Sequence, residues 1–155
     1  MLQLTSTITE NATLEIGLRD IEVPKPGADD VLIEVQASPI NPSDLGTLVG
    51  AGDLTSIRVE GEGEQSKVIM DIPESVMWAM KPRIGKPLPV GNEGSGIVTE
   101  AGENAKHLIG KVVSAVGGGM YAQYRVLPAM ACIVMPDGIE PKDCASSFVN
   151  PLTAL

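Results

Sequence analysis

Short runs of β-branched and other apolar residues, bounded by glycine, proline, asparagine or aspartate, make up most of this chain of 155 residues, which holds 17 glycines and 12 prolines. Such runs are typical of strands that turn back on one another, and they leave little room for long helices. Residues 30–37 carry apolar side chains on both faces, as in a closed or sandwiched sheet. The pattern predicts a mainly β fold.

Several further elements are expected from local patterns. One hairpin is predicted over residues 14–23, turning near Gly17, and a second over residues 58–72 around a Gly-Glu-Gly-Glu turn. A capped helical turn should begin at Ser43, and another short helix should occupy residues 73–80. Later strands are expected over residues 96–101, 111–116, 120–127 and 133–135.

Length and charge restrict the function. A chain of this length can bury a core without disulfides or metals. The formal net charge of −9 disfavours nucleic acid and anionic membranes as partners, and no apolar run approaches the ~20 residues that a membrane helix needs. We therefore expect a cytoplasmic protein. Cys132 and Cys144 stand alone in the sequence and are expected to be buried thiols.

Residues 90–98 read Val-Gly-Asn-Glu-Gly-Ser-Gly-Ile-Val, and four other segments accompany this glycine-rich run in a fixed order: 21–35, 39–44, 118–124 and 150–155. Together they resemble the N-terminal domain of the medium-chain dehydrogenase/reductase superfamily, in its zinc-independent quinone oxidoreductase and enoyl reductase branch. The resemblance covers nearly the whole chain. It implies a GroES-like, partly open β-barrel with a few short helices over residues 1–155.

Two features of length depart from that family. The stretch 53–88 is longer than the corresponding connection in the family, and we interpret it as an insertion. No G-x-G-x-x-G run opens a helix after a strand, so the Rossmann domain of the family is expected to be absent from these residues. By resemblance, the chain ends in the helix that would lead to that nucleotide-binding domain.

The resemblance also implies the chemistry. Asn41 and Asn92 stand where zinc enzymes of the superfamily carry cysteine and histidine, which argues against a catalytic zinc. NADPH would then deliver hydride to a quinone or an α,β-unsaturated carbonyl. Asn41, Asn150 and Thr153 would offer hydrogen bonds near the nicotinamide. Alternatively, Asn41-Pro42 and Asn150-Pro151 are turn and helix-start devices.

The proton donor is less clear from the sequence. Enoyl reductases of this branch carry a tyrosine shortly after the 39–44 loop, but this chain reads Gly50-Ala51-Gly52 there. Tyr121 and Tyr124 belong to another predicted strand. The sequence therefore favours a quinone-type reductase over an enoyl reductase, because solvent can protonate the product of a quinone reductase. Glu93 is a candidate acid if it is buried. The alternative is that Glu93 is a paired structural group.

Met77 and Trp78 form an apolar cluster within the 53–88 stretch. They could line a lid over a hydrophobic substrate, because loops often carry binding residues and methionine adapts to irregular ligands. The alternative, which is the commoner case for an isolated apolar cluster under a long loop, is a local packing plug.

The sequence thus predicts the substrate-binding domain of a zinc-independent NADPH-dependent oxidoreductase, acting on a small hydrophobic quinone or enone. Without its nucleotide-binding domain, the chain is expected to be inactive and to bind no cofactor. An apolar face over residues 148–155 would favour a homo-oligomer. The alternative is a stand-alone, non-catalytic GroES-like module for small-molecule binding or assembly.

Overall fold

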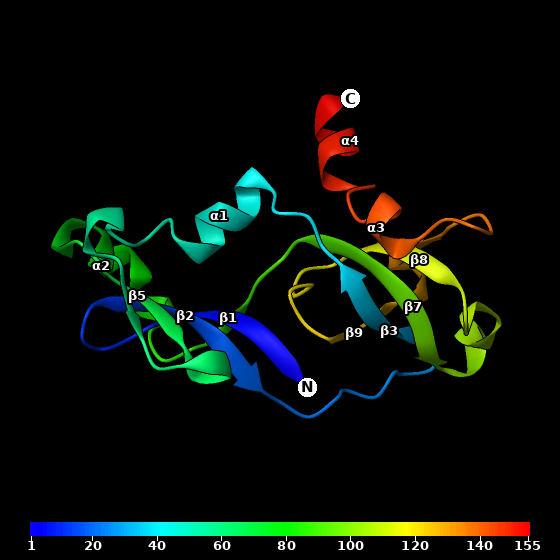
Figure 1. Cartoon of the computed structure of the whole chain (residues 1–155), viewed down its shortest axis with the longest axis horizontal. Helices are drawn as coiled ribbons and strands as arrows, with labels where there is room; N and C mark the ends of the chain where they lie inside the picture. The colour runs from blue at the N-terminus through cyan, green and yellow to red at the C-terminus, as the bar shows by residue number, and fades with distance from the viewer.

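The computed structural model describes residues 1–155 and divides the strands between two antiparallel sheets that lie side by side (Figure 1). Sheet 1 has the order β4-β5-β2-β1-β6, and sheet 2 has the order β10-β8-β7-β3-β9. Neither sheet closes on itself. The predicted mainly β, GroES-like fold is therefore confirmed as a pair of open sheets.

The elements are short. Sheet 1 contains β1 (Leu2–Ile8), β2 (Thr13–Asp20), β4 (Arg58–Glu60), β5 (Lys67–Asp71) and β6 (Leu88–Pro89). Sheet 2 contains β3 (Asp30–Ala37), β7 (Glu93–Ala101), β8 (Val112–Val116), β9 (Tyr124–Pro128) and β10 (Cys132–Val134). The α-helices are α1 (Pro42–Leu48), α2 (Glu74–Met80), α3 (Pro141–Cys144) and α4 (Val149–Ala154). Short 3-10 helices occupy Leu54–Ser56, Gly63–Gln65, Lys81–Arg83, Glu103–Leu108 and Ala129–Ala131. No helix combines the length and the apolar character needed to cross a membrane.

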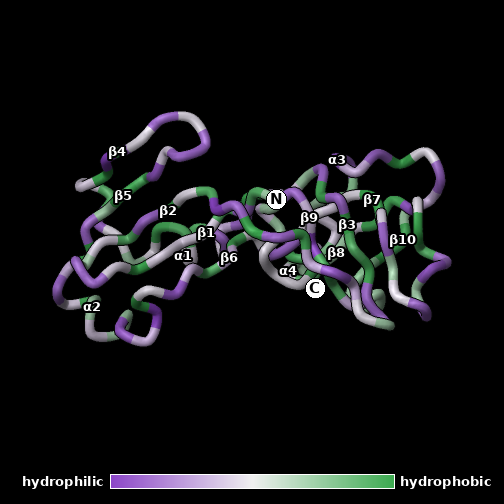
Figure 2. Tube along the Cα trace, turned by 90° about the horizontal axis from the view of Figure 1, so that it is seen from below, coloured by the Kyte–Doolittle hydropathy of each residue, from purple (hydrophilic) through white to green (hydrophobic).

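Each sheet buries its own hydrophobic core. The core of sheet 2 consists of Val31, Ile33, Val98, Ala105, Leu108, Val113, Ala115, Met120 and Leu127. The core of sheet 1 is smaller and consists of Ile8, Leu14, Ala51, Met70 and Ile72. Figure 2 shows hydrophobic stretches along the strands of both lobes and a more hydrophilic loop beyond β4. The fold therefore has two packing centres that must be connected.

Residues 121–123 make that connection. On one side, the Leu4 amide donates to the Tyr121 carbonyl over 2.8 Å and the Gln123 amide donates to the Leu2 carbonyl over 3.0 Å. On the other side, the Val35 amide donates to the Gln123 carbonyl over 2.9 Å. This segment therefore pairs with β1 of sheet 1 and with β3 of sheet 2, and it joins the sheets through backbone hydrogen bonds.

The hairpin expected near Gly17 is wrong. β2 runs without interruption through Gly17, which pairs with Thr5 of β1. The chain turns instead between Ile8 and Thr13, where Ala12 adopts a φ of 54° and the Thr9 amide donates to the Thr13 carbonyl over 2.9 Å. Ala12 occupies a left-handed conformation that glycine, not alanine, usually signals. The hairpin expected over residues 58–72 is confirmed by the pairing of β4 with β5.

Residues 53–88 are part of sheet 1. β5 pairs with β2, β6 pairs with β1, and Met70 and Ile72 enter the core. That this stretch is an insertion relative to the family remains a prediction. Of the two cysteines, Cys144 is buried, as expected, whereas Cys132 is only half-buried.

Candidate functional site

Three polar side chains are buried together where β7 begins beside α1. Asn41, Asp44 and Glu93 are each exposed by 1% or less of their surface. Asn41 precedes α1, Asp44 lies in its first turn, and Glu93 is the first residue of β7. Carboxylates are seldom excluded from water unless they are paired, so their partners define what this cluster does.

Glu93 bridges two segments. Its Oε1 accepts a hydrogen bond from Asn41 Nδ2 over 3.2 Å. Its Oε2 accepts from the backbone amides of Phe148 and Val149, over 2.8 and 3.1 Å, at the start of α4. Because both oxygens are occupied and the residue is fully buried, neither is open to a substrate. This geometry favours a paired structural role for the candidate acid.

Asp44 collects three donors from three segments. Its Oδ2 accepts from the Asn41 amide over 2.8 Å and from the Tyr121 hydroxyl over 3.0 Å. Its Oδ1 accepts from the Asn92 amide over 2.9 Å. The Tyr121 hydroxyl also lies 2.9 Å from the Pro39 carbonyl. Burial, followed by the hydrogen bond and the charge of Asp44, raises the pKa of Tyr121, so this phenol stays protonated and acts as a fixed donor.

Asn92 forms the polar rim of the buried cluster. Its Nδ2 donates to Ser43 Oγ over 2.8 Å, and its carbonyl accepts from the amides of Gly117 and Gly118, each over 3.2 Å. Asn92 is half-buried and Ser43 is exposed. These two side chains are therefore the part of the cluster that another molecule could reach.

Gly91 permits this close assembly. It has a φ of +95°, and a Cβ added there would lie 2.6 Å from Cδ1 of the Tyr121 ring. Gly96 likewise lies against the Glu34 carbonyl, where a side chain would overlap it. These two glycines of the 90–98 run therefore lie where the backbone approaches a neighbouring segment closely.

The remaining predicted site residues fall into two places. Asn150 and Thr153 are exposed on α4, and Thr153 Oγ1 donates to the Val149 carbonyl over 2.6 Å. Glu93 holds the first turn of the same helix, so the structure brings Asn41, Glu93 and α4 together. Met77 and Trp78 lie on α2, at the far end of the sheet 1 lobe from α4 (Figure 1).

The residues around Asn41 do not fit a catalytic zinc. The reachable donors are amides and a hydroxyl, whereas zinc in such sites takes thiolate and imidazole. His107 is the only histidine, and it lies in the 3-10 turn Glu103–Leu108. No three histidine, cysteine, aspartate or glutamate side chains gather closely enough to hold a metal ion.

Comparisons with known proteins identify the fold. The alcohol dehydrogenase GroES-like domain family matches residues 27–137, which is well over half of the chain. The chain belongs to this family. Prostaglandin reductase-3 from Mus musculus is 28% identical over 136 residues, which cover 86% of this chain and 28% of the relative. The resemblance to the medium-chain dehydrogenase/reductase superfamily is thereby confirmed.

Solved structures agree with this GroES-like assignment. A protein assigned as an NADPH:quinone reductase from Mesorhizobium loti is 28% identical, with a TM-score of 0.64, and the match covers 99% of this chain and 42% of that chain. A quinone oxidoreductase from Escherichia coli, complexed with NADPH, has a TM-score of 0.65 at 19% identity and supports the fold alone. It matches over 99% of this chain and 39% of its own. The chain therefore spans less than half the length of these proteins.

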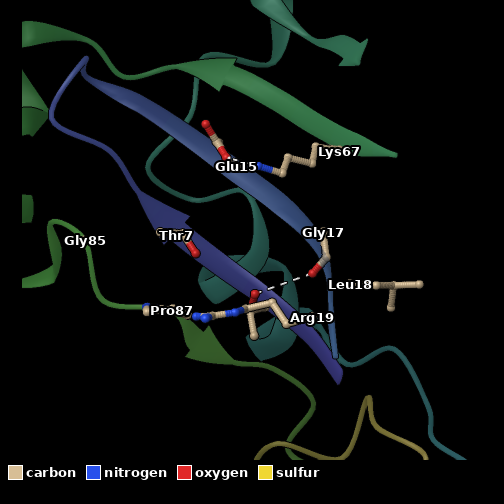
Figure 3. Close-up of a pocket in the computed structure, with 9 residues that line it drawn as sticks. Thr7, Glu15, Gly17, Leu18, Arg19, Lys67, Gly85 and Pro87 are labelled. Carbon is tan, nitrogen blue, oxygen red and sulfur yellow. Dashed lines mark hydrogen bonds and ion pairs between the residues drawn. The ribbon is translucent and has the colours of Figure 1, made fainter. Parts of the chain in front are cut away.

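A hollow of about 310 Å³ lies elsewhere on the GroES-like domain, on the outer face of sheet 1 (Figure 3). It opens over Gly17 and is lined mainly by polar side chains, including those of Thr7, Arg19 and Lys67. Lys67 pairs with Glu15 over 3.0 Å within it. None of the buried cluster residues lines this hollow, so we do not take it as the candidate site.

Two members of the cluster escaped the sequence analysis. Asp44 follows Asn41 by three residues, and that spacing is typical of a capping box, so it could have been found. Tyr121 is separated from Asp44 by 77 residues, and no local pattern connects them.

Proposed function

We propose that this chain is the substrate-side domain of a zinc-independent, NADPH-dependent reductase that acts on a quinone or an α,β-unsaturated carbonyl. In this proposal, a nucleotide-binding domain of the same enzyme covers α4 and the rim formed by Asn92 and Ser43. The 28% identity to the Mesorhizobium loti reductase over 99% of this chain supports the reaction class.

One observation carries the proposal. Where the zinc enzymes of the superfamily hold their metal, this chain has Asn41 and Asn92. Asn41 is 1% exposed, and its side chain is hydrogen-bonded to Glu93. The side-chain amide of Asn92 is hydrogen-bonded to Ser43. The interior of this site is therefore filled by an amide and carboxylate cluster, which poorly suits a borderline-soft ion.

The residues of this chain then act by positioning. The cofactor, when bound, supplies the hydride. On α4, the exposed Asn150 amide offers donors and an acceptor, and Thr153 Oγ1 keeps acceptor capacity because its proton is used on Val149. Such donors and acceptors could form hydrogen bonds with the carboxamide group of a nicotinamide. Asn41 would contribute indirectly, since its side chain faces the interior and not the rim.

In this proposal, solvent supplies the protons that the reduced product takes up. Tyr121 donates to Asp44 and its pKa is raised, which makes it a poor acid. Glu93 is enclosed with both oxygens occupied. A hydroquinone can take its protons from water, whereas an enoyl reductase needs a placed acid. We therefore favour a quinone as the acceptor.

The test compares this chain with a protein continued through the downstream coding sequence, using NADPH oxidation with a panel of quinones and enones. We expect turnover in the extended protein alone, unchanged by a zinc chelator. Turnover lost to the chelator and restored by zinc would refute the zinc-independent mechanism. An extended protein that oxidises NADPH with none of these acceptors would refute the reductase.

The cellular setting is also a proposal. We infer a cytoplasmic enzyme. This chain by itself should form a homo-oligomer, because Leu152 on α4 and Leu155 directly after it are exposed by 65% and 102% when no other domain covers them. Sedimentation of this chain measures its self-association, and a monomer at micromolar concentration would contradict the prediction. Met77 and Trp78 as a substrate lid remain a prediction that the placement of α2 does not support.

A further inference from the structure

We propose that Glu93 is a positioning residue that ties α4 to the loop of Asn41 and so sets the placement of Asn150 and Thr153. The inference rests on the proposed reductase function for its catalytic consequence. The connection between α4 and the loop of Asn41, called the tie below, rests on the hydrogen bonds that Glu93 accepts from both segments.

Glu93 is the connection between α4 and the two sheets. The amides of Phe148 and Val149 donate to Glu93 Oε2, over 2.8 and 3.1 Å. The other hydrogen bonds of the helix, such as Leu152 to the Phe148 carbonyl and Thr153 to the Val149 carbonyl, lie within it. Figure 1 shows α4 projecting from the body with its far end free. One carboxylate oxygen therefore fixes the half-buried base of a helix whose residues 150–154 are exposed.

The loop of Asn41 has a second, independent anchor. Asp44 accepts from the Asn41 amide over 2.8 Å and from the Asn92 amide over 2.9 Å. Removing Glu93 would leave these bonds intact, so the loop should keep its conformation. No hydrogen bond other than those to Glu93 joins α4 to the sheets, so the packing of the half-buried Phe148 and Val149 and of the preceding α3 is what would remain. The specific contribution of Glu93 is therefore the orientation of α4.

Glu93 is also held rigidly at its own backbone. It pairs with Val116 across sheet 2, and it lies between Asn92, anchored by Asp44, and Gly94, which packs against Ser38. A side chain on such a backbone can place its partners within a narrow range.

Asn41 provides a way to separate positioning from acid catalysis. Its Oδ1 is buried and faces the first turn of α1 without a hydrogen bond of regular geometry. If Glu93 is replaced by glutamine, the new amide can accept from Phe148 and Val149 and donate to Asn41 Oδ1 after the Asn41 amide flips. Glu93→Gln should therefore keep the tie, while Glu93→Ala removes it.

The first arm of the experiment uses this chain. Amide hydrogen exchange at Phe148 and Val149 should be slow in the wild type and in Glu93→Gln. It should be at least about tenfold faster in Glu93→Ala, because an opening that costs ~1.4 kcal/mol less is ten times more populated. Glu100→Ala is the matched control, since Glu100 is exposed on the same strand and makes no side-chain hydrogen bond. Equal exchange in wild type and Glu93→Ala would overturn the proposal.

The second arm uses the extended protein. Glu93→Ala should raise the KM for NADPH by about tenfold or more, since small displacements of positioning groups are costly, while Glu93→Gln should stay within a few-fold of wild type. Equal loss of kcat in both variants would identify Glu93 as an acid and refute positioning. If Glu93→Ala does not fold, Glu93→Gln and the wild-type exchange rates still decide. A wild type without reductase activity but with protected amides would refute the proposed function and leave the tie standing.

Discussion

Replacing Gly91 by alanine should lower the free energy of unfolding, because the new side chain would displace Tyr121. Gly91 has a φ of +95°, where an L side chain costs ~1–2 kcal/mol. The new Cβ would also lie 2.6 Å from Cδ1 of Tyr121 and 2.8 Å from its backbone nitrogen. Because the tyrosine must shift, its 3.0 Å hydrogen bond to Asp44 is lost, and a hydrogen bond to a charged group contributes about 1.5–3 kcal/mol. The free energy of unfolding should fall by roughly 2.5–5 kcal/mol, the sum of these two effects.

Gly110 supplies the control. It has a φ of +80°, and a Cβ added there meets nothing within 4 Å. Gly110→Ala should therefore lose only the ~1–2 kcal/mol of the backbone term. Urea unfolding measures both variants, with the midpoint moving and the slope unchanged. If Gly91→Ala is no less stable than Gly110→Ala, the contact with Tyr121 does not hold the cluster together, and the argument fails.

Further predictions concern the side chains of Tyr121, Cys132 and Trp78. Tyr121→Phe should lower the free energy of unfolding by about 1–3 kcal/mol, and Tyr124→Phe, whose hydroxyl has no hydrogen-bond partner, by less. Because the pKa of Tyr121 is raised in the folded state, its contribution is complete below pH ~10 and is lost as the pH rises further, so a flatter alkaline decline in Tyr121→Phe is expected and an identical decline would count against it. Burial raises the pKa of Cys132 to about 11, so iodoacetamide should label it slowly at pH 8 and faster as the pH approaches that value; labelling at pH 8 as fast as in urea would contradict this. Trp78 is 73% exposed, so acrylamide should quench its fluorescence almost as well as in the unfolded chain, and strong protection would show that another surface covers it.

The strands were predictable where side chains alternate and the turns contain glycine. Residues 30–37 were recognised with the bounds that β3 has, and the 58–72 hairpin was found. The turn before β2 was missed because Ala12, not a glycine, takes the positive φ of 54°. Gly17 drew the expected turn to itself, although in the sheet it only leaves space beside Lys67. The turn was therefore predicted at the wrong place, because an alanine has the positive φ expected of a glycine and the glycine lies within a strand.

The site was predictable only in part: some of its residues could be selected from the sequence, but not the hydrogen bonds that join them. Resemblance selected Asn41 and Glu93, and the burial of Glu93 was considered. The sequence could not show that Glu93 accepts from Phe148, because the two residues are 55 positions apart and one of the groups is a backbone amide. Every residue except proline has the same backbone amide, so the sequence does not mark which amides bind Glu93.

The segment 121–123 that joins the two sheets also dictates the order in which the chain can fold. Leu2 and Gln123 bond to each other through both backbone and side chain across 121 positions of sequence. During synthesis, β1 can pair with β2 early, but the edge at Leu2–Leu4 must wait until residues 121–123 have been translated. Long-range pairing of this kind slows folding, and an unpaired strand edge is a template for aggregation in the meantime. Production of this protein should therefore depend on how well a chaperone protects residues 1–4 until residues 121–123 have emerged from the ribosome.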